Sequence, residues 1–198
     1  MRDIQFRIIY RSFENRIDIV KYIIFFDNEC FVYYPIGMKN KGFKIVIFIL
    51  IPLLVGFGAS ALTRDAMFQF DMVAKPPLAP PGFLFPIVWT ILYIMMGVSS
   101  FLIFEYDAKG DVKLSKIKGR CVKLYVVQLI FNFFWSIIFF RFSLYYVAFA
   151  WLVILWVMVL ALIVESHKQN KMAAYLLIPY LLWMTFAGYL NLGIAFLN

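Results

Sequence analysis

Residues 75–104 read KPPLAPPGFLFPIVWTILYIMMGVSSFLIF, a proline-rich segment that leads into a long apolar run. From Phe83 to Phe104 this run contains no charged side chain. A helix needs roughly 20 such residues to cross a bilayer. Because lipid offers the backbone no hydrogen-bond partner, an open-ended segment of this kind crosses as an α-helix. The stretch therefore predicts a transmembrane helix that is preceded by a stiff loop.

Four other apolar segments also have the length of membrane-spanning helices: 45–62, 124–140, 143–164 and 173–197. The whole chain is 64% hydrophobic and only 15% charged. Soluble domains are about half apolar and a quarter charged, so this composition excludes soluble enzymes. We predict an all-α membrane protein, a five-transmembrane-helix bundle, in which the short link at 141–144 joins the third and fourth helices as a hairpin.

Residues 1–37 differ from the rest because charged residues interrupt every apolar run there. A lysine-rich stretch that begins at Met38 then leads directly into the first apolar segment. We expect 38–198 to be the membrane domain, and 1–37 to be an extension upstream of the functional start or a cytoplasmic tail. An alternative interpretation of 39–61 is a cleavable signal peptide that ends in Ala59-Ser60-Ala61.

The formal net charge of +8 arises mainly from lysines and arginines in three stretches that connect or precede the apolar segments. These stretches are 39–44, 109–123 and 168–171. The positive-inside rule places all three in the cytoplasm, which predicts a cytoplasmic N-terminus and an extra-cytoplasmic C-terminus. Since the charge follows the topology, we expect no nucleic-acid partner. The Lys-, Ile-, Asn- and Phe-rich composition is typical of an AT-rich bacterial genome and favours a bacterial plasma membrane.

No ionisable side chain lies in the middle of an apolar segment, which argues against an ion-coupled transporter. The two cysteines, Cys30 and Cys121, lack metal-ligand spacing. The only histidine, His167, is expected in a solvated loop rather than on a haem iron. We therefore predict no metal site and no required cofactor.

The apolar segments carry aromatic and amide side chains at helical spacing. The three faces are Trp89, Tyr93, Gly97 and Ser100; Gln128, Asn132, Trp135 and Ser136; and Trp183, Ala187 and Asn191. An amide in hydrocarbon must find a partner, so these amides are expected to point into the bundle. They either orient a flat apolar ligand or bond helix to helix, and the proline-rich loop is either a lid or a spacer.

Three blocks of the chain resemble the tryptophan-rich sensory protein/translocator protein (TspO/MBR) family. KPPLAPPGFLFPIVWTILYIMMG at 75–97 resembles its proline-rich signature and second helix. QLIFNFFWSIIFF at 128–140 resembles its third helix, and LLIPYLLWMTFAGYLNLGIAFLN at 176–198 its fifth. The blocks occur in the family's order.

The resemblance implies a five-helix bundle, commonly a homodimer, that binds a tetrapyrrole (porphyrin or haem) beneath the loop. We expect a receptor or carrier that acts in porphyrin transport or stress signalling. The ligand-binding residues expected from the resemblance are Phe70, Pro80, Trp89, Asn132, Trp135, Trp183 and Ala187. The residue pattern adds Tyr93 and Gln128. The alternative is a light- or oxygen-dependent porphyrin-degrading enzyme that uses Trp89 and Trp183.

The chain also departs from the family pattern. Leu78 replaces a frequent tryptophan, and Gln69 and Phe70 replace a frequent Trp-Tyr pair. A loop that is poor in indole favours binding over photochemistry. The family's sterol motif needs a basic residue after the tyrosine of the last helix, and none follows Tyr189. We therefore do not expect cholesterol binding.

Overall fold

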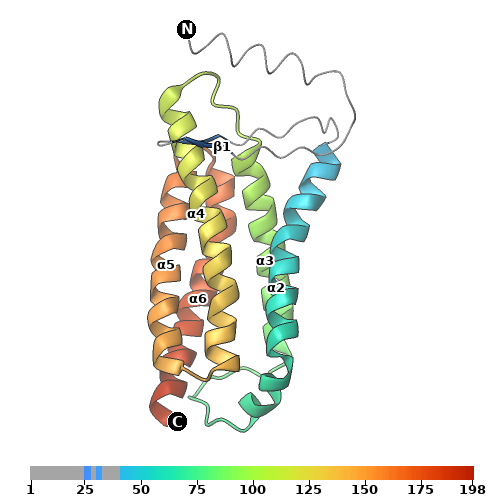
Figure 1. Cartoon of the computed structure of the whole chain (residues 1–198), viewed down its shortest axis with the longest axis vertical. Helices are drawn as coiled ribbons and strands as arrows, with labels where there is room; N and C mark the ends of the chain where they lie inside the picture. Colours follow the sequence, from blue (N-terminus) through green and yellow to red (C-terminus); the bar gives the residue numbers. More distant parts are fainter. Residues whose placement is uncertain (1–24, 28–29, 33–40) are drawn as a thin grey trace.

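The structure is a computed structural model that describes residues 25–27, 30–32 and 41–198, with side chains from Lys41 onward except for those of 66–71. Two three-residue strands, β1 (Phe25–Asp27) and β2 (Cys30–Val32), pair antiparallel. The rest is helical: α2 (Lys41–Asp71), α3 (Leu84–Phe104), α4 (Val112–Ser136) with its π-helical continuation η1 (Ile137–Arg141), α5 (Tyr145–His167) and α6 (Lys171–Leu197) (Figure 1).

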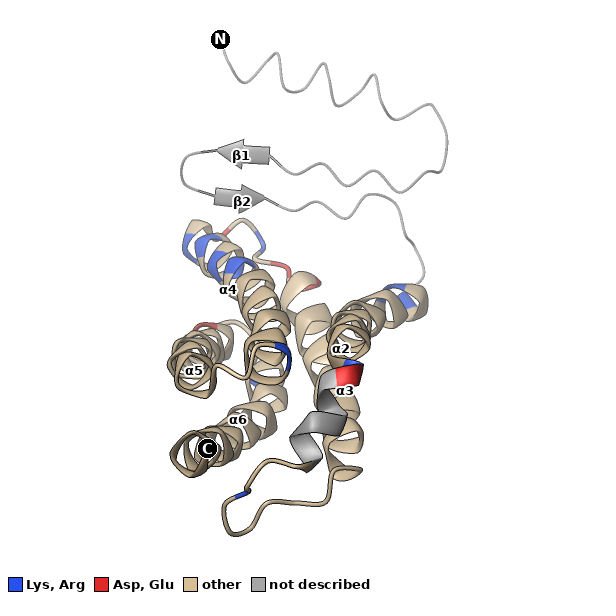
Figure 2. Cartoon of the chain, turned by 60° about the horizontal axis from the view of Figure 1, so that its bottom comes forward, with Lys and Arg blue, Asp and Glu red and all other residues tan. Residues whose placement is uncertain are grey.

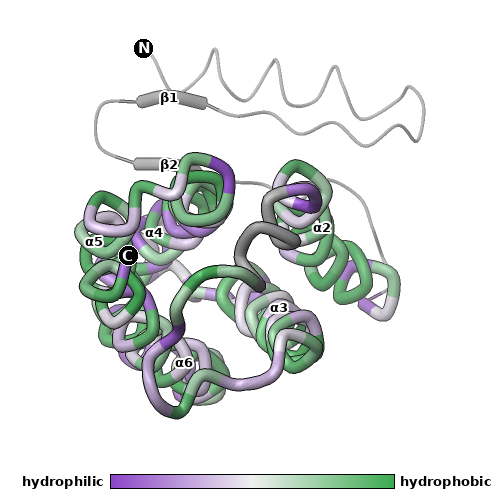
Figure 3. The backbone as a smooth tube through the Cα atoms, turned by 90° about the horizontal axis from the view of Figure 1, so that it is seen from below, coloured by the Kyte–Doolittle hydropathy of each residue, from purple (hydrophilic) through white to green (hydrophobic). Residues whose placement is uncertain are grey.

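Five of the described helices are long and apolar enough to cross a membrane, which confirms the predicted fold. They form a ring in which α2 contacts α3, α3 contacts α6, α6 contacts α5, α5 contacts α4, and α4 returns to α2 (Figure 3). The protein is an integral membrane protein. The lysines and arginines gather at the end of the bundle where α2 and α4 begin (Figure 2).

Two predicted helix boundaries were wrong. Helix α2 continues past the expected end at Leu62 to Asp71, and α4 begins at Val112, well before residue 124. The side chain of Asp111 caps α4 by accepting hydrogen bonds from the amides of Lys113 and Leu114 at 2.8 and 3.1 Å. The basic stretch that was expected to be a loop is therefore mostly the first three turns of a helix.

Two glycines allow α2 to approach α3 closely. A Cβ built on Gly97 would lie 2.5 Å from the Cα of Ile49 and 2.8 Å from the carbonyl oxygen of Phe48. A Cβ on Gly56 would collide with the ring of Tyr93. Gly56, which from the sequence suited packing either within the bundle or against a second subunit, thus faces its own α3. Without a hydrophobic driving force in lipid, such close backbone contact is what holds two helices together.

Gly97→Ala is expected to destabilise the protein by about 1–3 kcal/mol, because the added methyl group meets backbone rather than a mobile side chain. The measurement is the thermal unfolding midpoint of the purified protein in detergent. The matched control is Gly188→Ala in α6, where the new Cβ would lie 3.8 Å from Leu152 and 3.9 Å from Phe149. Equal midpoints for the two variants would contradict the close α2–α3 contact.

Candidate functional site

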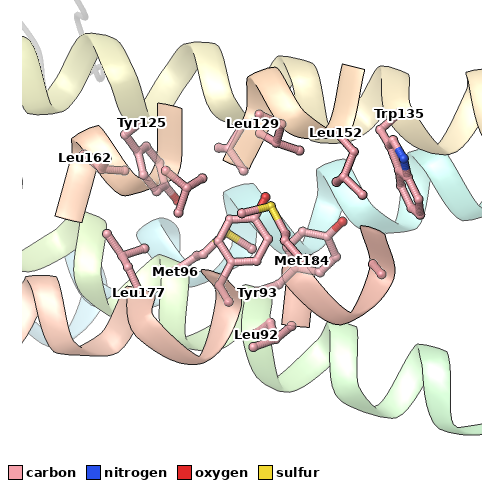
Figure 4. Close-up of a cluster of buried hydrophobic side chains, with 14 of the residues drawn as sticks. Leu92, Tyr93, Met96, Tyr125, Leu129, Trp135, Leu152, Leu162, Leu177 and Met184 are labelled. Carbon is pink, nitrogen blue, oxygen red and sulfur yellow. The ribbon is translucent and has the colours of Figure 1, made fainter. Parts of the chain in front are cut away.

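Tyr180 is at the centre of a buried hydrogen-bond network. Its hydroxyl accepts from Asn132 Nδ2 at 2.9 Å and donates to Gln128 Oε1 at 3.2 Å. The Tyr93 hydroxyl donates to Asn132 Oδ1 at 2.7 Å. All four side chains are buried. The network therefore joins α3, α4 and α6 in the middle of the bundle, where Tyr93, Met96 and Met184 lie together (Figure 4).

A second set of hydrogen bonds lies nearer the end of α4. The Trp135 indole donates to Asn191 Oδ1 at 3.4 Å, and Asn191 Nδ2 donates to the carbonyl oxygen of Tyr145 at 2.8 Å. Asn191 is 1% exposed. It thereby links α4, α6 and the first turn of α5, which supports the tight α4–α5 turn. The prediction that the three amides point into the bundle is confirmed, and each bonds between helices.

Aromatic side chains line the contact between α3 and α6. The ring centroids of Trp89 and Tyr180 are 6.1 Å apart, and those of Phe85 and Trp183 are also 6.1 Å apart. Phe85 and Trp89 are one helical turn apart on α3, as Tyr180 and Trp183 are on α6. We call these four residues the aromatic seam. Trp135 of α4 adjoins it, at 6.5 Å from Trp89.

The aromatic seam has an unsatisfied polar atom. The Trp183 side chain is half-buried, yet its Nε1 is buried and has no hydrogen-bond partner within the described part of the chain. Other indoles of the bundle are satisfied: Trp151 donates to the carbonyl oxygen of Phe131 at 2.9 Å and Trp156 to Thr185 Oγ1 at 2.9 Å. A buried N–H without an acceptor is costly, so Trp183 carries an unsatisfied donor within the aromatic seam.

The proline-rich loop is fixed onto the end of α6. The Asn198 side chain accepts from the amide of Ala74 and donates to its carbonyl oxygen, both at 3.1 Å. The Tyr189 hydroxyl donates to the carbonyl oxygen of Pro77 at 2.7 Å. Pro76 packs on Gly193, where a Cβ would come within 2.7 Å of the proline ring. The loop crosses this end of the bundle and is held there by these contacts (Figure 3).

The structure brings together most of the predicted ligand-binding residues. Trp89, Tyr93, Gln128, Asn132 and Trp135 are connected by the ring contacts and hydrogen bonds described above, and Trp183 joins the same set through Phe85. Ala187 is buried and Pro80 is half-buried. The side chain of Phe70 lies outside the described residues, although its backbone belongs to α2.

Tyr180 was not predicted as a site residue, whereas Asn191 was predicted from the sequence to point into the bundle. Both lie on the helical face that carries Trp183 and Ala187, at spacings of three, four or seven residues, so the periodicity of α6 contained the signal. His167 is exposed, as expected, but it is the last residue of α5 and not a loop residue. The described residues contain no group of three His, Cys, Asp or Glu side chains that is able to hold a metal ion.

Tyr180→Phe removes the hydroxyl that joins Gln128 to Asn132 and leaves two buried amide atoms unpaired. We expect a loss of about 1–2 kcal/mol, measured by unfolding in a series of mixed detergent micelles of increasing denaturing-detergent content. Tyr175→Phe on the same helix is the control, because Tyr175 is 52% exposed. The network is not structural if the two variants unfold alike.

Asn198→Ala is expected to release the loop. The amide of Ala74 loses its acceptor, so hydrogen exchange of the 72–82 backbone should accelerate by roughly fivefold or more. Asn170→Ala serves as the control, since Asn170 caps α6 at its other end through the amide of Ala173 at 3.2 Å. Unchanged exchange in Asn198→Ala, read by mass spectrometry of the loop peptide, would show that the loop is held by other contacts.

Comparison with known proteins agrees with this architecture. The TspO/MBR family profile matches residues 48–197. The tryptophan-rich protein TspO of Chlorobaculum tepidum is 34% identical over 163 residues, which cover 81% of this chain and 99% of the relative. The translocator protein homolog of Schizosaccharomyces pombe is 36% identical, with 75% and 88% covered, and the translocator protein of Bos taurus is 34% identical, with 73% and 83% covered. This chain belongs to the TspO/MBR family.

Proposed function

We propose that this protein is a membrane receptor or carrier that binds a tetrapyrrole, a porphyrin or haem, at the aromatic seam. The observation that carries the proposal is the buried indole N–H of Trp183, which has no partner among the described residues and lies beside the edge-on ring of Phe85 and the tilted ring of Phe186. The names of the relatives, translocator protein and tryptophan-rich sensory protein, favour transport or sensing as the role.

The chemistry of the seam suits a flat, largely apolar ligand that has a few acceptor atoms. Trp89 and Trp183 are half-buried, so parts of their rings are available to a guest. Offset stacking on an aromatic ring contributes about 0.5–1.5 kcal/mol beyond the burial of area. A porphyrin supplies such a face, and its carboxylates or ring nitrogens accept from an indole N–H. The amides of Asn132 and Gln128 already bond to Tyr93 and Tyr180, so their role is to hold the seam in shape.

The loop lies at the end of the bundle from which a ligand would reach the proposed site. A few neutral hydrogen bonds hold the loop in place there. Phe85 lies near the start of α3, the end over which the loop crosses. A ligand that enters from that side must pass the segment held by Tyr189 and Asn198. We place this end outside the cytoplasm, because the lysine-rich end of the bundle is opposite to it. The bacterial plasma membrane expected from the composition stays a prediction. The homodimer implied by the resemblance stays a prediction.

Titration of the detergent-solubilised protein with protoporphyrin in the dark tests the proposal. We expect a saturable shift of the porphyrin's Soret absorbance. Trp183→Phe keeps a ring but removes the N–H, so it should weaken binding by roughly tenfold. Trp151→Phe is the matched control, because the Trp151 indole is bonded to Phe131 away from the seam.

Each further outcome has a distinct meaning. If porphyrin binding does not saturate, a tetrapyrrole is excluded as the ligand of this site. If Trp151→Phe weakens porphyrin binding as much as Trp183→Phe does, the loss in Trp183→Phe is not a local effect of the missing N–H. If the bound porphyrin bleaches to a new chromophore under light, and Trp89→Phe or Trp183→Phe abolishes the bleaching, the protein is instead the porphyrin-degrading enzyme.

A further inference from the structure

The first turns of α4 carry a row of exposed basic side chains. Lys113, Lys116, Arg120 and Lys123 are three or four residues apart, which places them on one face of the helix. All four are exposed, whereas Ile117, Cys121 and Val122 of the same helix are buried. We call these four residues the basic row.

The described basic residues near this end fall into two groups. Lys44 pairs with Glu105 at 2.9 Å, and Lys118 donates to the carbonyl oxygen of Tyr106 at 3.0 Å. In the basic row, Arg120 reaches Glu165 at 3.2 Å while its side chain stays 60% exposed. Among the side chains of residues 41–65 and 72–198, no carboxylate forms an ion pair with Lys113, Lys116 or Lys123. Their charge is therefore left for an external anion.

The length of α4 sets the depth of the basic row. From Val112 to Arg141 the helix has 30 residues, which at about 1.5 Å each span about 45 Å, whereas the hydrocarbon core is about 30 Å thick. About ten residues must extend beyond the core. They extend at the basic end, where α4 reaches farther than α3 and α5 (Figure 1). The basic row therefore lies at the level of the lipid headgroups.

We propose that the basic row is a binding site for the phosphate headgroups of anionic phospholipids in the cytoplasmic leaflet. Long lysine stems lie along apolar surface while their ammonium groups reach the headgroup layer.

Each lysine at the level of the headgroups adds to the electrostatic attraction between the basic row and anionic lipid. The full chain in neutral detergent is titrated with phosphatidylglycerol, and bound lipid is counted by native mass spectrometry, with phosphatidylcholine of the same acyl chains as reference. We expect preferential retention of phosphatidylglycerol. The triple substitution Lys113→Gln, Lys116→Gln and Lys123→Gln should lower its affinity by roughly tenfold or more.

Two variants keep the test specific. The charge-preserving triple Lys113→Arg, Lys116→Arg and Lys123→Arg should retain the preference. Arg64→Gln with Arg141→Gln, which removes positive charge at the other end of the bundle, should not change it. Equal retention of both lipids, or equal loss in this control, would overturn the proposal. Displacement of the lipid by soluble glycerol phosphate at comparable concentration would overturn the lipid as source and identify a free-phosphate site.

Discussion

The rest of the bundle depends on the two hydrogen bonds that the Tyr180 hydroxyl makes, one to Asn132 and one to Gln128. In lipid, apolar side chains gain little by leaving one apolar environment for another, so helices need close packing and interhelical hydrogen bonds. Tyr180 accepts from Asn132 and donates to Gln128, and through Asn132 it reaches Tyr93 of α3. The bonds set the rotation of α3, α4 and α6 together. This rotation of the three helices places the Trp89 ring against Tyr180 and the Trp183 ring against Phe85, which forms the aromatic seam.

Sequence patterns predicted the elements and the inward direction of the amides because both follow from strong, local constraints. A backbone in lipid must be helical, and Asn132 or Asn191 in hydrocarbon must find a partner. The choice of partner was not predictable, because a tyrosine such as Tyr180 suits a membrane interface as well as a core. The start of α4 was mispredicted because its lysines were taken as a loop. Beyond the hydrocarbon a helix tolerates charge, and the cap at Asp111 was the missed signal.

The loop and the seam depend on contacts between distant segments, which no periodicity reveals. Pro76 lies against α6 because Gly193 has no side chain, and the Asn198 side chain bonds to Ala74, which is 124 residues earlier in the chain. Leu78 adopts a left-handed backbone with φ of 68° between these contacts and is 81% exposed. The loop thus turns a large apolar side chain outward, where the family pattern has an indole. A ligand at the seam is therefore held by the helices rather than by the loop tip.

The two ends of the bundle differ in charge and in the contacts that hold them, and this difference connects the proposed ligand site with the proposed lipid site. The loop end is closed by neutral hydrogen bonds and packed prolines, which break one at a time at modest cost and suit a cover over an entrance. The opposite end carries lysines that form no ion pair with a described carboxylate, on a helix that is longer than the membrane core is thick. Headgroup binding at that end fixes the height of α4, and α4 carries Gln128, Asn132 and Trp135. Because these residues hold Tyr180 and adjoin Trp89, fixing α4 also fixes the depth at which the aromatic seam meets a ligand arriving from the other side.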